Sequence, residues 1–245
     1  MTFDRGKFDK EVHENSLLVQ KDADLEIHKL EFIDLSNKYK YAYFWTWMGL
    51  PIIQMPEDIV NIQEIICETR PDIIIETGIA WGGSLLFYSS IAASMGLDCK
   101  VIGIDTVIPD ENRNKILNSN LGNSIELILG SSVDEATFAE VRSRIAPDAR
   151  VLVILDSHHT DSHVFAELNA WSELVTPGSY IVVCDTMIEY TNSPTDRPRP
   201  WEKGNSPLTA VTRFLENSER FTDKNIHNQK ATLTFHKGGY LLAIN

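Results

Sequence analysis

The chain has 245 residues, 43% of them hydrophobic and 23% charged, which predicts one soluble α/β domain with a short additional segment. Its formal net charge of -13 disfavours binding to nucleic-acid phosphates or to an anionic membrane surface, because like charges repel. Cys67, Cys99 and Cys184 lack C-x-x-C spacing and no apolar run reaches membrane-spanning length, so we expect a cytoplasmic protein without disulfides, a zinc knuckle or membrane insertion.

Residues 1–50 differ in composition from the rest of the chain. They are polar at first and then aromatic, with six aromatic residues from Tyr39 to Trp47. This pattern predicts one or two helices that end in a loop carrying aromatic side chains, ahead of the main domain over residues 51–245. The rings either cover the core or contact a ligand, and the sequence favours neither.

Apolar runs and amphipathic segments alternate regularly after Met55. The helical pattern of residues 57–70 ends at Pro71, and the β-branched run 72–77 suits a strand that is buried on both faces. Strands alternating with helices predict a doubly wound, mostly parallel, Rossmann-like sheet, the α/β class. Further helices are expected at 83–96, 133–145 and 161–175, and further strands at 100–105, 125–130, 150–156 and 180–185.

The C-terminal part departs from this alternation. A helix is expected at about 208–217. The runs 231–235 and 239–244 then face each other across the turn His236-Lys237-Gly238, and so short a connection allows only antiparallel pairing. A parallel sheet that ends in a C-terminal antiparallel hairpin is the layout of class I methyltransferases, and a plain dinucleotide-binding domain lacks it.

Acidic residues occur at the ends of several predicted strands. In open α/β sheets the ligand crevice lies outside the carboxyl ends of the strands. Carboxylates therefore line the edge of the sheet where a site is expected. These residues are Glu76, Asp105, Asp156 and Asp185.

A glycine-rich segment, ETGIAWGGS, joins the first strand of the main domain to the following helix. Gly78 permits a sharp turn, and Gly82-Gly83 let a ligand approach the helix N-terminus closely. The G-x3-G-G spacing does not meet the G-x-G-x-x-G fingerprint of dinucleotide binding, and a tight βα turn without a ligand is the alternative. The candidate cofactor contacts in this loop are Glu76, Gly78, Ala80 and Ser84.

Later strand ends extend the candidate cofactor site. Asp105 ends the second strand, where an acidic residue typically binds the ribose hydroxyls of an adenosine cofactor, although a helix N-cap is the alternative role. Ser131 follows the third strand and is placed to contact an adenine. Asp156, at the end of the fourth strand, is included among the cofactor contacts.

Asp156 and Asp185 are also candidate metal ligands. If their strands are neighbours, the two carboxylates converge and repel unless a proton or a cation lies between them. Mg²⁺ is the natural partner of such oxygen ligands. His159 follows Asp156 by three residues, and a neutral imidazole there suits a general base that deprotonates a bound hydroxyl. A surface or capping histidine is the alternative.

The chain resembles the cephalosporin hydroxylase / rhamnosyl O-methyltransferase family over roughly residues 40–245. The resemblance is carried, in order, by the runs PIIQMPEDI, RPDIIIETGIAWGGSLLFYSS, VIGID, ILDSHHTDSHVFAELNAWSELVTPGSYIVVCDT, GNSPLTAV and LTFHKGGYLL. It implies a class I methyltransferase fold, S-adenosylmethionine as cofactor, a Mg²⁺ ion as in several related sugar O-methyltransferases, and a homo-oligomer.

The resemblance also implies roles for individual residues. Glu76, Gly78 and Ser84 match the cofactor loop, and Asp105 matches the ribose-binding acid. Asp156 and Asp185 match metal ligands, and His159 matches a proposed general base. One departure is Cys184, where the family often has glutamate, because a neutral thiol is a poor ligand for Mg²⁺.

These features favour S-adenosylmethionine-dependent methylation of a hydroxyl on a small molecule, with a sugar or another polyhydroxy compound as the expected substrate. The alternatives are a non-haem iron oxygenase built on His159-Thr160-Asp161, a nicotinamide-dependent oxidoreductase, and a non-catalytic cofactor-binding protein. The loop 186–207 is expected to cover the crevice, with an ordinary surface loop as the alternative. Its basic and aromatic residues are Arg197, Arg199, Trp201 and Lys203.

Overall fold

The computed structural model describes residues 3–192 and 198–245, and within them a seven-stranded sheet has the order β5-β4-β3-β6-β7-β9-β8. The five strands from β5 to β7 are parallel, and β9 pairs antiparallel with both β7 and β8. The chain runs outward from β3 to β5 and then returns to β6, so the strand order reverses between β3 and β6. The strands are β3 Ile73–Thr77, β4 Lys100–Asp105, β5 Ile125–Leu129, β6 Val151–Leu155, β7 Tyr180–Val183, β8 Phe221–Thr222 and β9 Tyr240–Ala243.

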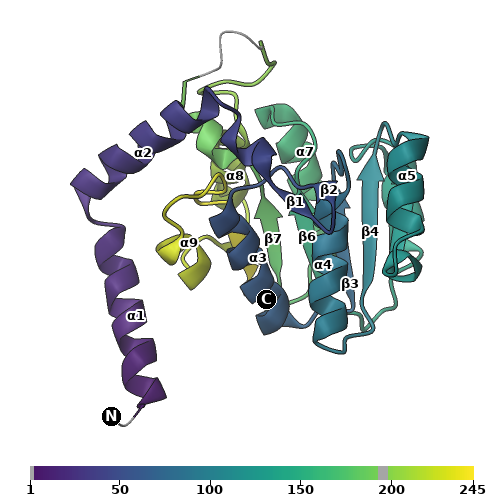
Figure 1. The fold of residues 1–245 in the computed structure, drawn as a ribbon, viewed down its shortest axis with the longest axis horizontal. Coiled ribbons are helices and arrows are strands. Elements are labelled where there is room, and N and C mark those ends of the chain that lie inside the picture. The colour runs from purple at the N-terminus through teal and green to yellow at the C-terminus, as the bar shows by residue number, and fades with distance from the viewer. Residues whose placement is uncertain (1–2, 193–197) are drawn as a thin grey trace.

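Helices cover both faces of the sheet and give three layers (Figure 1). Successive strand residues point to opposite faces, so Ile74 packs with one layer of helices while Ile73 and Ile75 pack with the other. The first layer contains α3 Pro56–Thr69, α4 Gly83–Ser94 and α5 Asp110–Leu117, and the second contains α6 Glu135–Arg142, α7 Asp161–Trp171 and α8 Pro207–Glu216.

Helix α3 shows how the local sequence sets these elements. Pro56 stands in its first turn, where a missing backbone N–H costs nothing, and the buried Ile62, Ile65 and Ile66 form its apolar face. Arg70 adopts a left-handed conformation with φ 47° and ends the helix just before Pro71.

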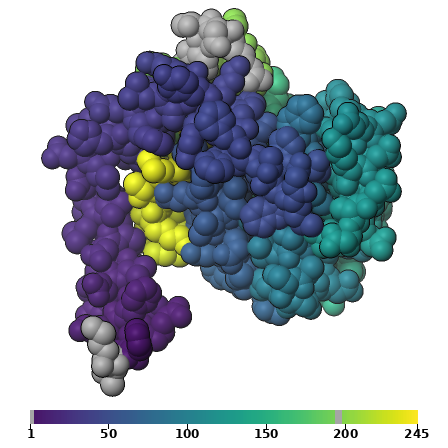
Figure 2. Space-filling view, in the orientation of Figure 1, coloured from purple at the N-terminus to yellow at the C-terminus, as the bar shows by residue number. Residues whose placement is uncertain are grey.

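The N-terminal segment forms an arm beside this domain. It contains α1 Arg5–Val19, α2 Ala23–Asn37 and the 3₁₀ helix Tyr41–Phe44, which confirms the predicted helices and aromatic loop. A small hairpin of β1 Thr46–Trp47 and β2 Leu50–Pro51 follows. Figure 2 shows the arm along one side of the molecule, with α1 beside the C-terminal helix α9 Ile226–Lys230. A domain boundary at residue 50 stays a prediction.

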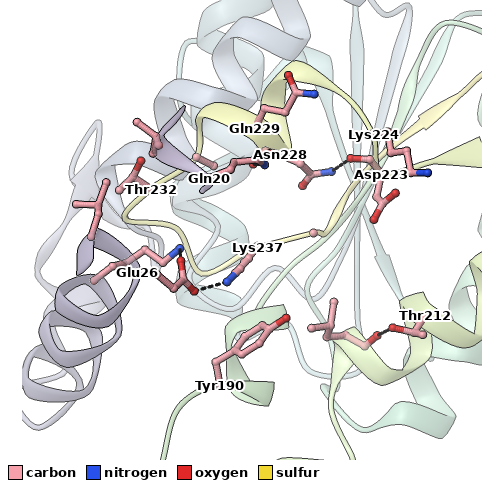
Figure 3. A pocket seen from close by; sticks show the side chains of 16 residues that line it. Gln20, Glu26, Tyr190, Thr212, Asp223, Lys224, Asn228, Gln229, Thr232 and Lys237 are labelled. Atoms are coloured by element: carbon pink, nitrogen blue, oxygen red, sulfur yellow. Dashed lines mark hydrogen bonds and ion pairs between the residues drawn. The ribbon is translucent and has the colours of Figure 1, made fainter. Parts of the chain in front are cut away.

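A cavity of about 670 Å³ lies between the arm and the C-terminal part of the chain. Glu26 of α2, in the wall of this cavity, forms an ion pair with Lys29 at 2.6 Å. It forms a second ion pair with Lys237, which Figure 3 shows as a dashed line. The Lys237 ammonium also lies 4.4 Å from the centre of the Tyr190 ring. None of the described helices has the length and apolarity that crossing a bilayer requires.

The predicted elements of the main domain match their observed positions closely, with one correction, while α5, β8 and α9 were not predicted. Residues 231–235 form no strand. The antiparallel partner of β9 at the sheet edge is β8, and β7 pairs with its other side. The reason is that Glu57 and Asp58 of α3 accept the backbone N–H groups of Thr232, Leu233 and Phe235, which are then unavailable to a strand. The mostly parallel sheet with antiparallel strands at its C-terminal edge is confirmed.

Candidate active site

The parallel strands end at the same level, which brings the predicted site residues together. In the register, Thr77 lies opposite both Ile104 and Leu155, and Leu155 lies opposite Val183. The residues that follow these positions therefore surround one crevice at the point where the strand order reverses, the usual place for a ligand in an open α/β sheet.

Gly78 gives the turn after β3 its shape. Its φ is 82°, and a Cβ atom there would lie 2.1 Å from the carbonyl oxygen of Asp156. Only glycine permits both the left-handed backbone and this close approach of two strand ends. Ala80 in the same loop is left-handed too, with φ 44°, and its N–H points to Asp105. The loop is thus held tightly around the crevice.

Glu76 is completely buried beneath this loop. Its carboxylate accepts hydrogen bonds from the hydroxyls of Ser84 at 2.6 Å and Tyr88 at 2.7 Å, two residues on neighbouring turns of α4. Burial raises the pKa of Glu76 to about 7, although the two hydroxyls oppose the shift. The structure therefore places Glu76 and Ser84 together, as predicted, and adds Tyr88, which stands four residues after Ser84 on the same helix face.

Asp105 closes the other side of the glycine loop. Its Oδ2 accepts the N–H groups of Ile79 at 3.0 Å and Ala80 at 3.3 Å, and its Oδ1 accepts that of Val107 at 3.1 Å. Beside it lies a pocket of about 410 Å³, within the range of small-molecule sites. The predicted residues Gly78, Ala80, Asp105, Ser131 and Asp156 all line this pocket, together with Ser132, Ser157, His158 and His163.

Asp156, His159 and Asp185 form a second cluster next to this pocket. One ligand atom from each lies within 4.8 Å of the others, and His159 Nε2 is 3.4 Å from Asp185 Oδ2. Burial raises the pKa of Asp156 well above its usual range, and the carboxylates of Asp185 and Glu76 raise it further. Two carboxylate oxygens that repel each other in this way fit a divalent cation between them.

A backbone hydrogen bond to His236 holds Asp185 in this cluster. Asp185 is left-handed with φ 55°, and its backbone N–H donates to His236 Nδ1 at 3.2 Å. His236 is buried, and among the described residues its Nε2 has no hydrogen-bond partner; Asp58 Oδ2 is 3.9 Å away. Cys184, in contrast, is buried in the hydrophobic core and is not one of the three clustered groups.

His159 lies beneath the loop that was predicted to cover the crevice. The Trp201 ring meets the His159 ring edge to face, with ring centres 4.8 Å apart, and meets His158 at 5.4 Å. Burial lowers the pKa of His159, an effect that the nearby Asp185 partly opposes, so the imidazole is neutral and can accept a proton. Arg199 stacks on Trp201 at 5.0 Å, Lys203 is exposed, and Arg197 lies outside the described residues.

The proposed iron pair His159-x-Asp161 is not assembled. Asp161 forms an ion pair with Arg213 at 2.8 Å. His159 instead lies close to the carboxylates of Asp156 and Asp185. This arrangement differs from the facial triad with two histidines that non-haem iron oxygenases use.

Sequence reasoning missed a cluster of polar side chains in the wall of the pocket. Ser157 Oγ donates to the buried Glu167 at 2.7 Å, and His163 Nε2 lies 3.0 Å from Ser157 Oγ and 3.2 Å from Ser132 Oγ. Glu167 follows His163 by four residues on α7, a spacing that could have signalled their contact. Gln54 was also missed, and it lines a smaller hollow beside the glycine loop.

The sequence of this chain is similar to that of a known protein family over most of its length. The family model described as rhamnosyl O-methyltransferase/CmcI matches residues 39–244. A rhamnosyl O-methyltransferase of Mycobacterium leprae (strain TN) is 31% identical over an alignment of 156 residues, and the match covers 61% of this chain and 66% of that protein. The chain thus matches less than two thirds of the length of this relative.

Solved structures agree on the fold. An apo structure of CmcI superposes with a TM-score of 0.61 at 23% identity, covering 83% of this chain and 77% of the other. A structure of CmcI with Mg and SAM gives a TM-score of 0.59 at 22% identity, covering 83% and 78%. These likenesses confirm the predicted fold class.

Proposed function

Because the chain belongs to the rhamnosyl O-methyltransferase/CmcI family, we propose that it methylates a hydroxyl group of a small molecule with S-adenosylmethionine as the methyl donor. The observation that carries this proposal is the adjacency of two sites at one sheet edge. A pocket lined by Asp105 and the glycine loop adjoins the cluster of Asp156, His159 and Asp185, and Asp156 belongs to both.

The pocket fits an adenosine cofactor. Asp105 stands at the end of β4, where its carboxylate can accept ribose hydroxyls, and Ser131, which follows β5, lines the same pocket. Gly78, Ala80 and Asp156 line the same pocket, and because Asp156 also belongs to the cluster, a cofactor bound there would lie next to the cluster.

The cluster supplies the groups that the transfer needs. Asp156 and Asp185 would hold Mg²⁺. When bound, S-adenosylmethionine supplies an electrophilic methyl group and the cation stabilises the negative charge of a deprotonated acceptor hydroxyl. His159 accepts the hydroxyl proton, and the carboxylate of Asp185 beside it stabilises the resulting imidazolium. Trp201 covers His159 and limits the access of water to it.

A sugar or another polyhydroxy compound is the proposed acceptor class. A cation between two carboxylates can bind vicinal hydroxyls together, and this would place one of them next to His159. The curated relative from Mycobacterium leprae is a rhamnosyl O-methyltransferase, in agreement with this class of substrate.

The test is calorimetric titration of the purified protein with S-adenosylmethionine, with and without Mg²⁺, followed by incubation with rhamnosides and other polyols. We expect saturable binding, stronger acceptor binding with Mg²⁺, and release of one S-adenosylhomocysteine for each methyl group transferred. Absence of cofactor binding in both conditions would refute the proposal. Cofactor binding that is unaffected by Mg²⁺, with full turnover in a chelator, would refute the metal site alone.

A further inference from the structure

Gln54 is a buried side chain without hydrogen bonds. It is 2% exposed, and neither Oε1 nor Nε2 has a partner among residues 3–192 and 198–245. Because buried polar groups in folded proteins are almost always paired, a side chain of this kind marks a place where a ligand or a water completes the bonding.

Gln54 lines a hollow of about 30 Å³ between β2 and the glycine loop. Because one water-sized group needs roughly 10–15 Å³, this space is sufficient for about two such groups, for example an ammonium and one carboxylate oxygen. The segment that carries Gln54 lies tightly on the start of α4, because a Cβ atom on Gly83 would come within 2.2 Å of the carbonyl oxygen of Pro51. The backbone therefore holds Gln54 over the loop.

The hollow adjoins the pocket assigned to adenosine. Gly78, Ala80 and Asp156 line both cavities, whereas Gln54 and Ser84 line only the hollow. A ligand that fills the pocket with its nucleoside part can consequently extend one end group past Gly78 and Ala80 towards Gln54.

The surrounding charges indicate what that end group is. The buried carboxylate of Glu76 bonds to Ser84, and Asp156 forms another wall of the hollow, so a positively charged group is favoured there. A glutamine amide offers one acceptor and two donors, which together match a group that carries both an ammonium and a carboxylate.

We propose that Gln54 binds the amino-acid end of the sulfonium cofactor, accepting from its ammonium group at Oε1 and donating to its carboxylate from Nε2. This inference rests on the proposed function. It assigns Gln54 the recognition of the amino-acid end, which lies apart from the nucleoside contacts at Asp105 and Ser131.

The experiment compares two ligands and two variants. S-adenosylhomocysteine has the amino-acid end and 5′-methylthioadenosine lacks it. Calorimetry should show that Gln54→Met weakens S-adenosylhomocysteine binding by about 10- to 100-fold, as expected for hydrogen bonds to charged groups, and leaves 5′-methylthioadenosine binding unchanged. Gln63→Leu, which removes an amide from the outer side of α3, is the matched control and should change neither affinity.

Thermal unfolding separates this role from a structural one. Gln54→Met removes two unpaired polar atoms from the interior, so without ligand its Tm should equal or exceed that of the wild type. If this variant does not fold, Gln54→Glu keeps the side-chain size and repels the ligand carboxylate, and it should also weaken S-adenosylhomocysteine binding selectively.

Three outcomes would overturn the inference. Equal losses for both ligands would mean that Gln54 shapes the whole pocket. No loss for either would mean that the amide holds a buried water only. If the wild type binds neither ligand, the proposed function itself fails, and the inference fails with it.

Discussion

His236 Nδ1 accepts the backbone N–H of Asp185 at 3.2 Å, and this bond joins a buried histidine to a proposed metal ligand. Asp185 is left-handed with φ 55°, a conformation that costs a non-glycine residue on the order of 1–2 kcal/mol unless the surroundings hold it. Asp58 and Glu57 of α3 fix the loop that carries His236. The position of Asp185 therefore depends on α3, through the loop that carries His236.

Replacing His236 should weaken cation binding without touching a ligand atom. We expect His236→Leu to lower Mn²⁺ affinity by about 10-fold or more, as losses of supporting hydrogen bonds to metal ligands do. His236→Asn should recover most of the affinity, because its Oδ1 can accept the same N–H. Titration of Mn²⁺ followed by electron paramagnetic resonance measures both. Equal affinities for the Leu and Asn variants would contradict the positioning role.

The repulsion between Asp156 and Asp185 predicts opposite effects of Asp156→Asn on stability and on cation binding. Without a cation the variant should be more stable than the wild type, because it removes one of two facing carboxylates. A gain of about 1 kcal/mol raises Tm by roughly 2–4 °C in a chain of this size. Added Mg²⁺ should raise the wild-type Tm and leave that of the variant unchanged.

Differential scanning fluorimetry with Mg²⁺ and with a chelator measures these shifts. Asp148→Asn, at an exposed position, is the matched control and should respond to Mg²⁺ as the wild type does. A variant that is less stable than the wild type in chelator, and still stabilised by Mg²⁺, would rule out the carboxylate pair as the cation site.

We expect the free energy of unfolding to depend on pH through the titration of Glu76. Its pKa is raised from 4.5 to about 7, so the folded state favours the protonated form. Its contribution to stability is therefore fully present below about pH 4.5 and is lost as the pH rises to about 7. Glu76→Gln does not titrate, so over this window the wild type should lose about 3 kcal/mol relative to the variant. Urea unfolding at several pH values tests this, and a constant difference would contradict it.

We expect replacement of His159 to lower turnover while cofactor binding stays intact. His159→Gln should lower kcat by about 10²- to 10⁴-fold, the usual contribution of a general base, while S-adenosylhomocysteine affinity stays unchanged. Because its pKa is lowered, the wild-type rate should persist to a pH below the ordinary histidine pKa of about 6.5. His28→Gln, an exposed histidine on α2, is the control. Full activity of His159→Gln would move the base elsewhere.

The sheet and its ligand edge were predictable because they depend on local patterns. Apolar runs such as 151–155 are bounded by turn residues, and acidic residues at parallel strand ends must meet once the strands pair. Helix α5 was missed because its sequence, DENRNKIL, has no apolar period, and only Asn112 and Ile116 are buried.

What the sequence could not reveal depends on contacts between distant segments. The run ATLTF looks like a strand, yet carboxylates more than 170 residues earlier, at Glu57 and Asp58, bind its backbone. His236 begins the predicted turn, in which Gly239 N–H donates to its carbonyl, but its side-chain contact with Asp185 joins segments 51 residues apart and has no local signal. Gln54 carries no local signal at all, because its unpaired state appears only once the interior is assembled.

Lys237 follows His236 directly in the chain, and its ammonium reaches Glu26 on the N-terminal arm. The arm is thus attached to the residue that directly follows His236, the side chain that holds the backbone of Asp185. A protein shortened to begin after α2 would release this tether, and trimming the N-terminus to aid crystallisation would then lower cation affinity. Mg²⁺ constants measured on shortened and intact chains are consequently not interchangeable.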